Sequence, residues 1–134
     1  MPSTRTGPSA PRALTDIEAA YHADPLSDPL ALELGLAYAN LKRPHDAVPL
    51  LQHAIRSYPK LDLARYYAGV SLLAVDRVED GLKHLEYAFR LSPVNVARFI
   101  NDGAAHKFGR HAEVRRLLAR WSKNFQDARD RGYA

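Results

Sequence analysis

Three prolines stand 34 residues apart in this chain, and small and apolar residues repeat with the same spacing. The prolines are Pro25, Pro59 and Pro93. Four further classes of position keep the period: Ile17, Leu51 and Leu85; Ala20, Ala54 and Ala88; Ala13, Ala47 and Gly81; and Gly35, Gly69 and Gly103. A fixed period of this length is typical of a chain in which copies of one supersecondary unit cover each other's apolar faces. The period therefore predicts a repeat architecture.

Within each repeat, the apolar residues follow helical spacing. In the clearest unit, a first helix is predicted from about Pro29 to Leu41 and a second from about His45 to Ser57, with Pro59 ending it because the residue before a proline avoids the α region. Two helices approach to about 8–10 Å, most closely where the facing residues are small, which explains the repeated glycines and alanines. Pro49 is the exception, since a proline inside a helix removes one hydrogen bond and should bend or delay that helix.

The period also divides the chain. We expect a flexible N-terminal tail over 1–12 and a helical array over 13–126, followed by a C-terminal tail over 127–134. The array consists of a leading helix over 13–25 and three repeats over 28–61, 62–95 and 96–126. In the third repeat Gly103 stays in step, but the second helix arrives one residue early, which predicts a shorter turn near Gly109.

The repeated residues resemble the tetratricopeptide repeat (TPR), whose 34-residue helix-turn-helix pattern reads W-x₂-L-G-x₂-Y…A-x₃-F…P. The best copy is Leu34-Gly35-x₂-Tyr38…Ala47-x₃-Leu51…Pro59, which lacks only the leading aromatic residue. The resemblance implies an all-α fold: a right-handed superhelical solenoid of antiparallel helix pairs. It also implies a concave groove, lined by the first helices, that holds a peptide or helix of another protein.

By the same resemblance, the groove would be lined by Leu32, Leu36, Asn40, Tyr66, Val70, Leu73, Ile100, Ala104 and Lys107. Family members that grip acidic C-terminal tails of chaperones carry Lys, Arg and Asn in their grooves. This chain has apolar residues there, such as Leu32, Leu36 and Val70, which predicts an apolar anchor and no carboxylate clamp. An alternative is that the chain's own tail or a second copy covers these side chains.

No pattern in the chain indicates catalysis, a metal or a cofactor. There is no cysteine, and the six histidines include no H-E-x-x-H pair. No nucleophile elbow is present, and the glycines follow the packing period instead of forming a phosphate-binding loop. The start of the chain has no apolar signal region and no segment is long enough to span a membrane, so we expect a cytoplasmic protein without membrane insertion.

The last helix carries two further hypotheses. An apolar stripe runs along it: Val114, Leu118, Trp121, Phe125 and Ala128. The stripe either covers the third repeat or leaves Trp121 and Phe125 free for self-association. Residues 107–134 hold 8 basic and 3 acidic side chains, and Arg116, Arg120 and Lys123 form a cationic back that could contact a polyanion weakly.

The sequence therefore predicts a non-catalytic protein-interaction adaptor or chaperone-like holder that binds a peptide or helix in an apolar groove. Two alternatives stay open: a scaffold that assembles with itself through the C-terminal helix, and a weak, nonspecific nucleic-acid binder.

Overall fold

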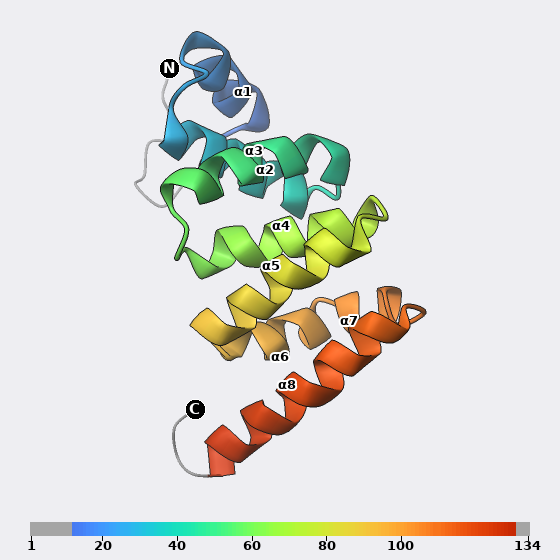
Figure 1. Ribbon diagram of the computed structural model, residues 1–134. Helices are drawn as coiled ribbons and strands as arrows, with labels where there is room; N and C mark the ends of the chain where they lie inside the picture. The colour runs from blue at the N-terminus through green and yellow to red at the C-terminus, as the bar shows by residue number, and fades with distance from the viewer. Residues whose placement is uncertain (1–11, 131–134) are drawn as a thin grey trace.

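All regular structure in the described part of the chain is helical. The computed structural model describes residues 12–130, which contain no strand. Its helices are α1 (Leu14–Ala23), α2 (Asp28–Asn40), α3 (Pro44–Ser57), α4 (Asp62–Ala74), α5 (Val78–Leu91), α6 (Val94–Asn101), α7 (Ala104–Lys107) and α8 (Ala112–Asp130). The helices are stacked in chain order from α1 at one end to α8 at the other (Figure 1). The predicted all-α class is confirmed.

The first two repeats are antiparallel helix pairs, α2 with α3 and α4 with α5, and α3 packs against α4 to join them. Two glycines allow the pairs to close. A Cβ added to Gly35 would lie 2.9 Å from Leu51 Cδ2, and one added to Gly69 would lie 2.6 Å from Leu85 Cγ. These distances are shorter than a normal carbon contact, so the close approach of the helices requires glycine at both positions.

The turns between paired helices also repeat. Lys42 and Asp76 have positive φ angles of 62° and 65°. After each of them the next backbone N–H reaches back into the first helix, from Arg43 to Tyr38 O and from Arg77 to Leu72 O, both at 2.9 Å. This is the pattern of a Schellman motif, which satisfies the last carbonyls of a helix and reverses the chain. The second helix of each pair therefore starts in the same way.

The third repeat departs from this plan. Its first helix stops at Asn101, because Gly103 adopts a φ of 81°, and the short helix α7 follows. A Cβ on Gly103 would meet nothing within 4 Å. Gly103 thus keeps the sequence period but not the packing role predicted for it, and it divides the helix in two. Asn95, fully buried, fixes α6 by donating to Asp62 Oδ2 (2.9 Å) and to the backbone oxygen of Ala88 (3.0 Å).

Several predicted boundaries shift. The leading helix ends at Ala23, and the last helix continues to Asp130 instead of ending at 126. Helix α3 begins at Pro44 and runs through Pro49, so a delayed start was the wrong expectation. Residues 1–11 and 131–134, which hold most of the two predicted tails, lie outside the described residues.

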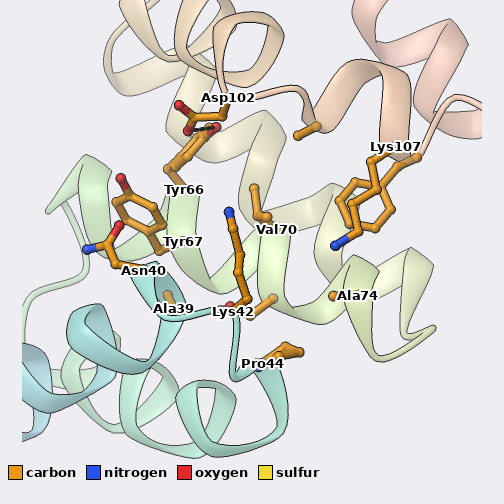
Figure 2. Close-up of a pocket in the computed structure, with 13 residues that line it drawn as sticks. Ala39, Asn40, Lys42, Pro44, Tyr66, Tyr67, Val70, Ala74, Asp102 and Lys107 are labelled. Carbon is orange, nitrogen blue, oxygen red and sulfur yellow. Dashed lines mark hydrogen bonds between the residues drawn. The ribbon is translucent and has the colours of Figure 1, made fainter.

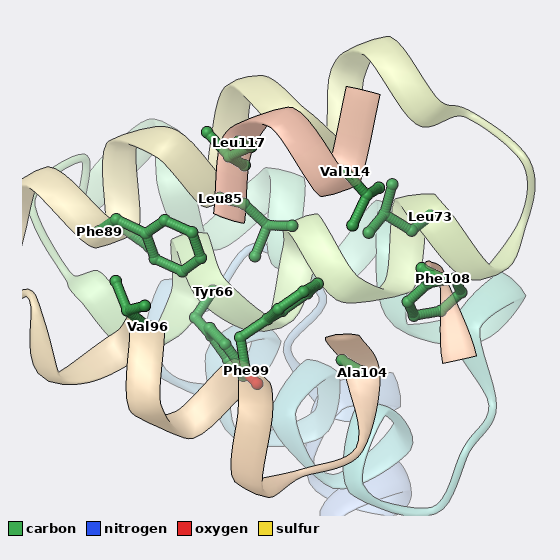
Figure 3. Packing of buried hydrophobic residues seen from close by; sticks show 11 residues of the cluster. Tyr66, Leu73, Leu85, Phe89, Val96, Phe99, Ala104, Phe108, Val114 and Leu117 are labelled. Carbon is green, nitrogen blue, oxygen red and sulfur yellow. The ribbon is translucent and has the colours of Figure 1, made fainter. Parts of the chain in front are cut away.

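Buried side chains form two clusters along the array. One joins α1–α3 to the start of α4 and is centred on Leu34, Leu51 and Ala68. The other joins α4 to α8 and contains the aromatic residues Phe89, Phe99 and Phe108 together with Tyr66 (Figure 3). No helix within residues 12–130 combines the length and apolar content needed to cross a bilayer.

Candidate functional site

A pocket of about 210 Å³ opens on the face that α2, α4, α6 and α7 form, which we call the groove face. Residues of all three repeats line it (Figure 2): Ala39, Asn40, Lys42, Pro44, Tyr66, Tyr67, Val70, Ser71, Ala74, Asp102, Ala104, Lys107 and Phe108. Its size is below the range of about 300–1,000 Å³ found for small-molecule sites. A pocket of this volume can take one side chain of a bound protein.

Five of the nine predicted groove residues line this pocket: Asn40, Tyr66, Val70, Ala104 and Lys107. Leu32, Leu36 and Ile100 belong to α2 and α6 but lie outside it, with Leu32 and Leu36 packed against the N-terminal core cluster and Ile100 49% exposed. The prediction for Leu73 was wrong, because its side chain is fully buried inside the core. Leu73 lies two turns after Tyr66 on the same face of α4, and both side chains are buried in the same core cluster.

Tyr66 forms part of the pocket wall, although its side chain is 1% exposed. Its hydroxyl donates a hydrogen bond of 2.9 Å to Asp102 Oδ2, shown dashed in Figure 2. Burial, followed by this bond, raises the pKa of Tyr66 above its ordinary value of 10.0. Tyr66 therefore stays a neutral donor that holds the α6–α7 junction against α4, and it is not an open contact for a ligand.

Sequence reasoning missed several lining residues, among them Lys42, Tyr67 and Asp102. Lys42 enters the site because its left-handed backbone turns the chain at the end of α2. Asp102 reaches the pocket because the first helix of the third repeat is broken at Gly103, between α6 and α7. A left-handed residue at the end of a helix is usually glycine or asparagine, which the sequence would reveal. Here the position is occupied by Lys42, so nothing in the sequence signalled this turn.

Two lysines give the pocket its charge. In Figure 2 the side chains of Lys42 and Lys107 come from opposite sides and turn their ammonium groups toward the middle. Neither makes an ion pair with another residue in the range 12–130. Lys107 Nζ lies 5.4 Å from the centre of the Phe108 ring. Asp102 is the acidic side chain in the lining, so the lining residues carry a formal excess of one positive charge.

Elsewhere, an aspartate, a histidine and a serine meet at the start of α2. Hydrogen bonds from Ser57 and then from His53 lower the pKa of Asp28, and His53 Nε2 lies 2.8 Å from Asp28 Oδ1. In a catalytic triad the histidine lies between the acid and the nucleophile. Here the carboxylate lies between the other two, so the arrangement is not that of a triad. Asp28 instead ties the start of α2 to α3, at a helix end where negative charge is favourable.

Within residues 12–130 no three His, Asp or Glu side chains are grouped to hold a metal.

Helix α8 covers the third repeat. Val114 and Leu117 are buried in the core, and the Trp121 ring meets Phe89 edge to face with centroids 6.2 Å apart. Trp121 thus follows the alternative in which the stripe covers the third repeat, self-association stays a prediction, and the side chain of Phe125 lies outside the described residues. Of the three predicted polyanion contacts, Arg120 is paired with Glu86 of α5 at 2.7 Å, whereas Arg116 and Lys123 are exposed.

Comparison with known proteins supports the helical-repeat fold. No protein-family model and no curated protein sequence matches the chain. Solved structures do match. Among them are "MamA MSR-1 C2", with a TM-score of 0.60, 19% identity and 83% of this chain covered, and a mutant of MamA, with a TM-score of 0.65, 25% identity and 82% covered. This chain spans 66% and 64% of their lengths. MamA has a TPR-like helical-repeat fold, and the match supports the same fold class for this chain.

Proposed function

We propose that this protein is a non-catalytic interaction adaptor or chaperone-like holder that binds a peptide or helix of a partner on its groove face. The observation that carries the proposal is the pocket between Lys42, Val70 and Lys107, because each of these residues comes from a different repeat. A ligand seated there would contact all three repeats at once, which is how stacked repeats are used for recognition. A cytoplasmic location remains a prediction from the sequence.

The wall of the pocket fits one apolar anchor. Val70, Ala74 and Phe108 contribute apolar surface, and Tyr67 stands edge-on to Tyr66 with ring centroids 5.0 Å apart. Binding energy in protein interfaces is concentrated in a few residues that fill such pockets. Because a short groove buries less than about 1,200 Å², we expect micromolar affinity.

The test is selection of random dodecapeptides displayed on phage against the full chain and against Val70→Arg. Val70 is half-buried in the pocket lining, so an arginine there would fill the cavity and add a third cation. The wild type is expected to enrich a set of peptides that Val70→Arg fails to retain. Circular dichroism would verify that the variant keeps its helix content.

The matched control is Val94→Arg, which makes the same change at a residue that is 56% exposed and outside the pocket. This control should retain the peptides selected by the wild type. If Val70→Arg binds the selected peptides as well as Val94→Arg does, binding on the groove face is ruled out.

A further inference from the structure

The pocket has a charge that the apolar-groove hypothesis did not anticipate. The first and third repeats bring Lys42 and Lys107 to the pocket, and neither ammonium group has an acidic partner within residues 12–130. By contrast, Arg43 and Arg77 in the equivalent turns of the first two repeats are each paired with an aspartate at 2.9 Å. The pocket lysines are therefore the cations available to a ligand.

We propose that the pocket binds an acidic segment of a partner protein, with an Asp or Glu side chain held between Lys42 and Lys107 and a neighbouring apolar side chain inserted against Val70. This inference rests on the proposed function and specifies its ligand. The carboxylate supplies the acidic partner that the two lysines lack within residues 12–130, and the apolar side chain fills a cavity of about 210 Å³. Charge complementarity of this kind selects partners more than it adds affinity.

The lining favours a carboxylate over a phosphate. Asp102 stands in the same wall, where its charge opposes a dianion more strongly than a singly charged carboxylate. Ser71, only 4% exposed, also lines the pocket, where its hydroxyl can donate or accept a hydrogen bond. The pocket also contains no arginine fork of the type that binds phosphate in a bidentate manner.

The side chains of residues 1–11 and 131–134 do not supply an Asp or Glu for the pocket. Residues 1–11 contain Arg5 and no acidic side chain, and residues 131–134 contain Arg131 and no acidic side chain. These segments would bring a further positive side chain toward two lysines. A separate protein with an acidic and apolar sequence is the occupant that complements the site.

The experiment repeats the dodecapeptide selection with the double charge reversal Lys42→Glu/Lys107→Glu in the full chain. Both lysines are exposed and unpaired within residues 12–130, so the reversal should leave the helix content and the melting temperature unchanged. Lys60→Glu/Lys83→Glu is the control, because it changes the net charge equally at two exposed lysines outside the pocket.

The wild type and the control should select peptides in which Asp or Glu stands next to a large apolar residue. Lys42→Glu/Lys107→Glu should bind those peptides roughly tenfold more weakly and should instead select peptides with Lys or Arg. Added salt should weaken wild-type binding of the acidic peptides and narrow this difference.

Each other outcome overturns the inference. Selection of the same acidic peptides by the charge-reversed variant, or of peptides without acids by the wild type, would show that the lysines do not choose the ligand while leaving a peptide-binding groove in place. If no peptide is enriched, the proposed function itself fails. Two further measurements test other occupants. If sedimentation velocity shows a wild-type dimer that only Lys42→Glu/Lys107→Glu disrupts, the occupant is a second copy. If the wild type binds a single-stranded DNA dodecamer and only this variant loses it, the occupant is a nucleic acid.

Discussion

Gly69 and Gly103 occupy equivalent positions of the sequence repeat, yet their surroundings have nothing in common. Gly69 has no side chain because Leu85 Cγ would lie 2.6 Å from its Cβ, whereas Gly103 is a glycine because its φ is 81°. A single residue type therefore serves helix packing at one position and chain reversal at the other. The period predicts where glycine recurs but not which of these two properties is used.

Substitution by asparagine separates the two roles. Asparagine tolerates the left-handed region, and nothing lies within 4 Å of the Gly103 Cβ position, so Gly103→Asn should lower the free energy of unfolding by less than about 1 kcal/mol. Gly69→Asn places a polar side chain against Leu85 and should cost about 3 kcal/mol or more. Urea denaturation of both variants measures the difference. Equal losses would contradict the separate roles.

His84 gives the fold a dependence on pH. Its ring in α5 is half-buried, and its Nδ1 lies 3.3 Å from Arg65 Nη1. Burial, followed by the charge of Arg65, lowers the pKa of His84 below its ordinary value of 6.5. The unfolded chain therefore takes up a proton at a pH where the folded chain does not. The stability that neutral His84 contributes is complete above about pH 6.5 and is lost as the pH falls below that value.

Replacing His84 with Gln should flatten the fall in unfolding free energy between about pH 7 and pH 5. His22→Gln serves as the control, since it makes the same change at an exposed residue at the end of α1. Urea denaturation over a series of pH values measures the slopes. The role assigned to His84 would be excluded by a slope in His84→Gln as steep as that of the wild type.

At the scale of the helices, the sequence predicted the first two repeats closely and the third only in part. The predicted helix from about Pro29 to Leu41 is observed as Asp28–Asn40, because packing positions, a proline at the start and Pro59 after its partner all agree. In the third repeat the spacing continued while the backbone did not, since a left-handed glycine looks the same in a sequence as a close-packed one. Four of the thirteen lining residues lie next to or after that break: Asp102, Ala104, Lys107 and Phe108. The break is why Asp102 was not foreseen.

At the same scale, Pro49 destabilises helix α3 by removing one of its backbone hydrogen bonds. It lies inside the helix, so the His45 carbonyl has no N–H partner four residues later. Proline costs about 3 kcal/mol relative to alanine inside a helix, and its restriction of the unfolded chain returns about 1 kcal/mol, so Pro49→Ala should stabilise the protein by about 2 kcal/mol.

The control for this change is Pro44→Ala, because Pro44 is the first residue of the same helix and its missing N–H would have had no partner there. Its substitution should change stability by less than about 1 kcal/mol. Thermal denaturation distinguishes the two variants. A melting temperature that does not rise in Pro49→Ala would mean that the helix already absorbs the proline without cost.

At the scale of the molecule, stacking places three repeats beside one pocket while the outer helices complete the core. Helix α8 covers the third repeat with Val114 and Leu117, and Arg120 pairs with Glu86 to fasten it to α5. On the groove face, residues far apart in the chain meet around a cavity, from Ala39 to Phe108. The architecture therefore gives the proposed ligand a site that three repeats build together.

The most direct measurement is a titration of the isotope-labelled full chain with a selected peptide, followed by amide chemical shifts in NMR. A chain of 15.0 kDa is well suited to residue-by-residue assignment. Binding on the groove face predicts that the largest shifts cluster around Lys42, Val70, Asp102 and Lys107. Shifts concentrated on the outer helices α3 and α5 or along α8, with the pocket residues unchanged, would contradict it.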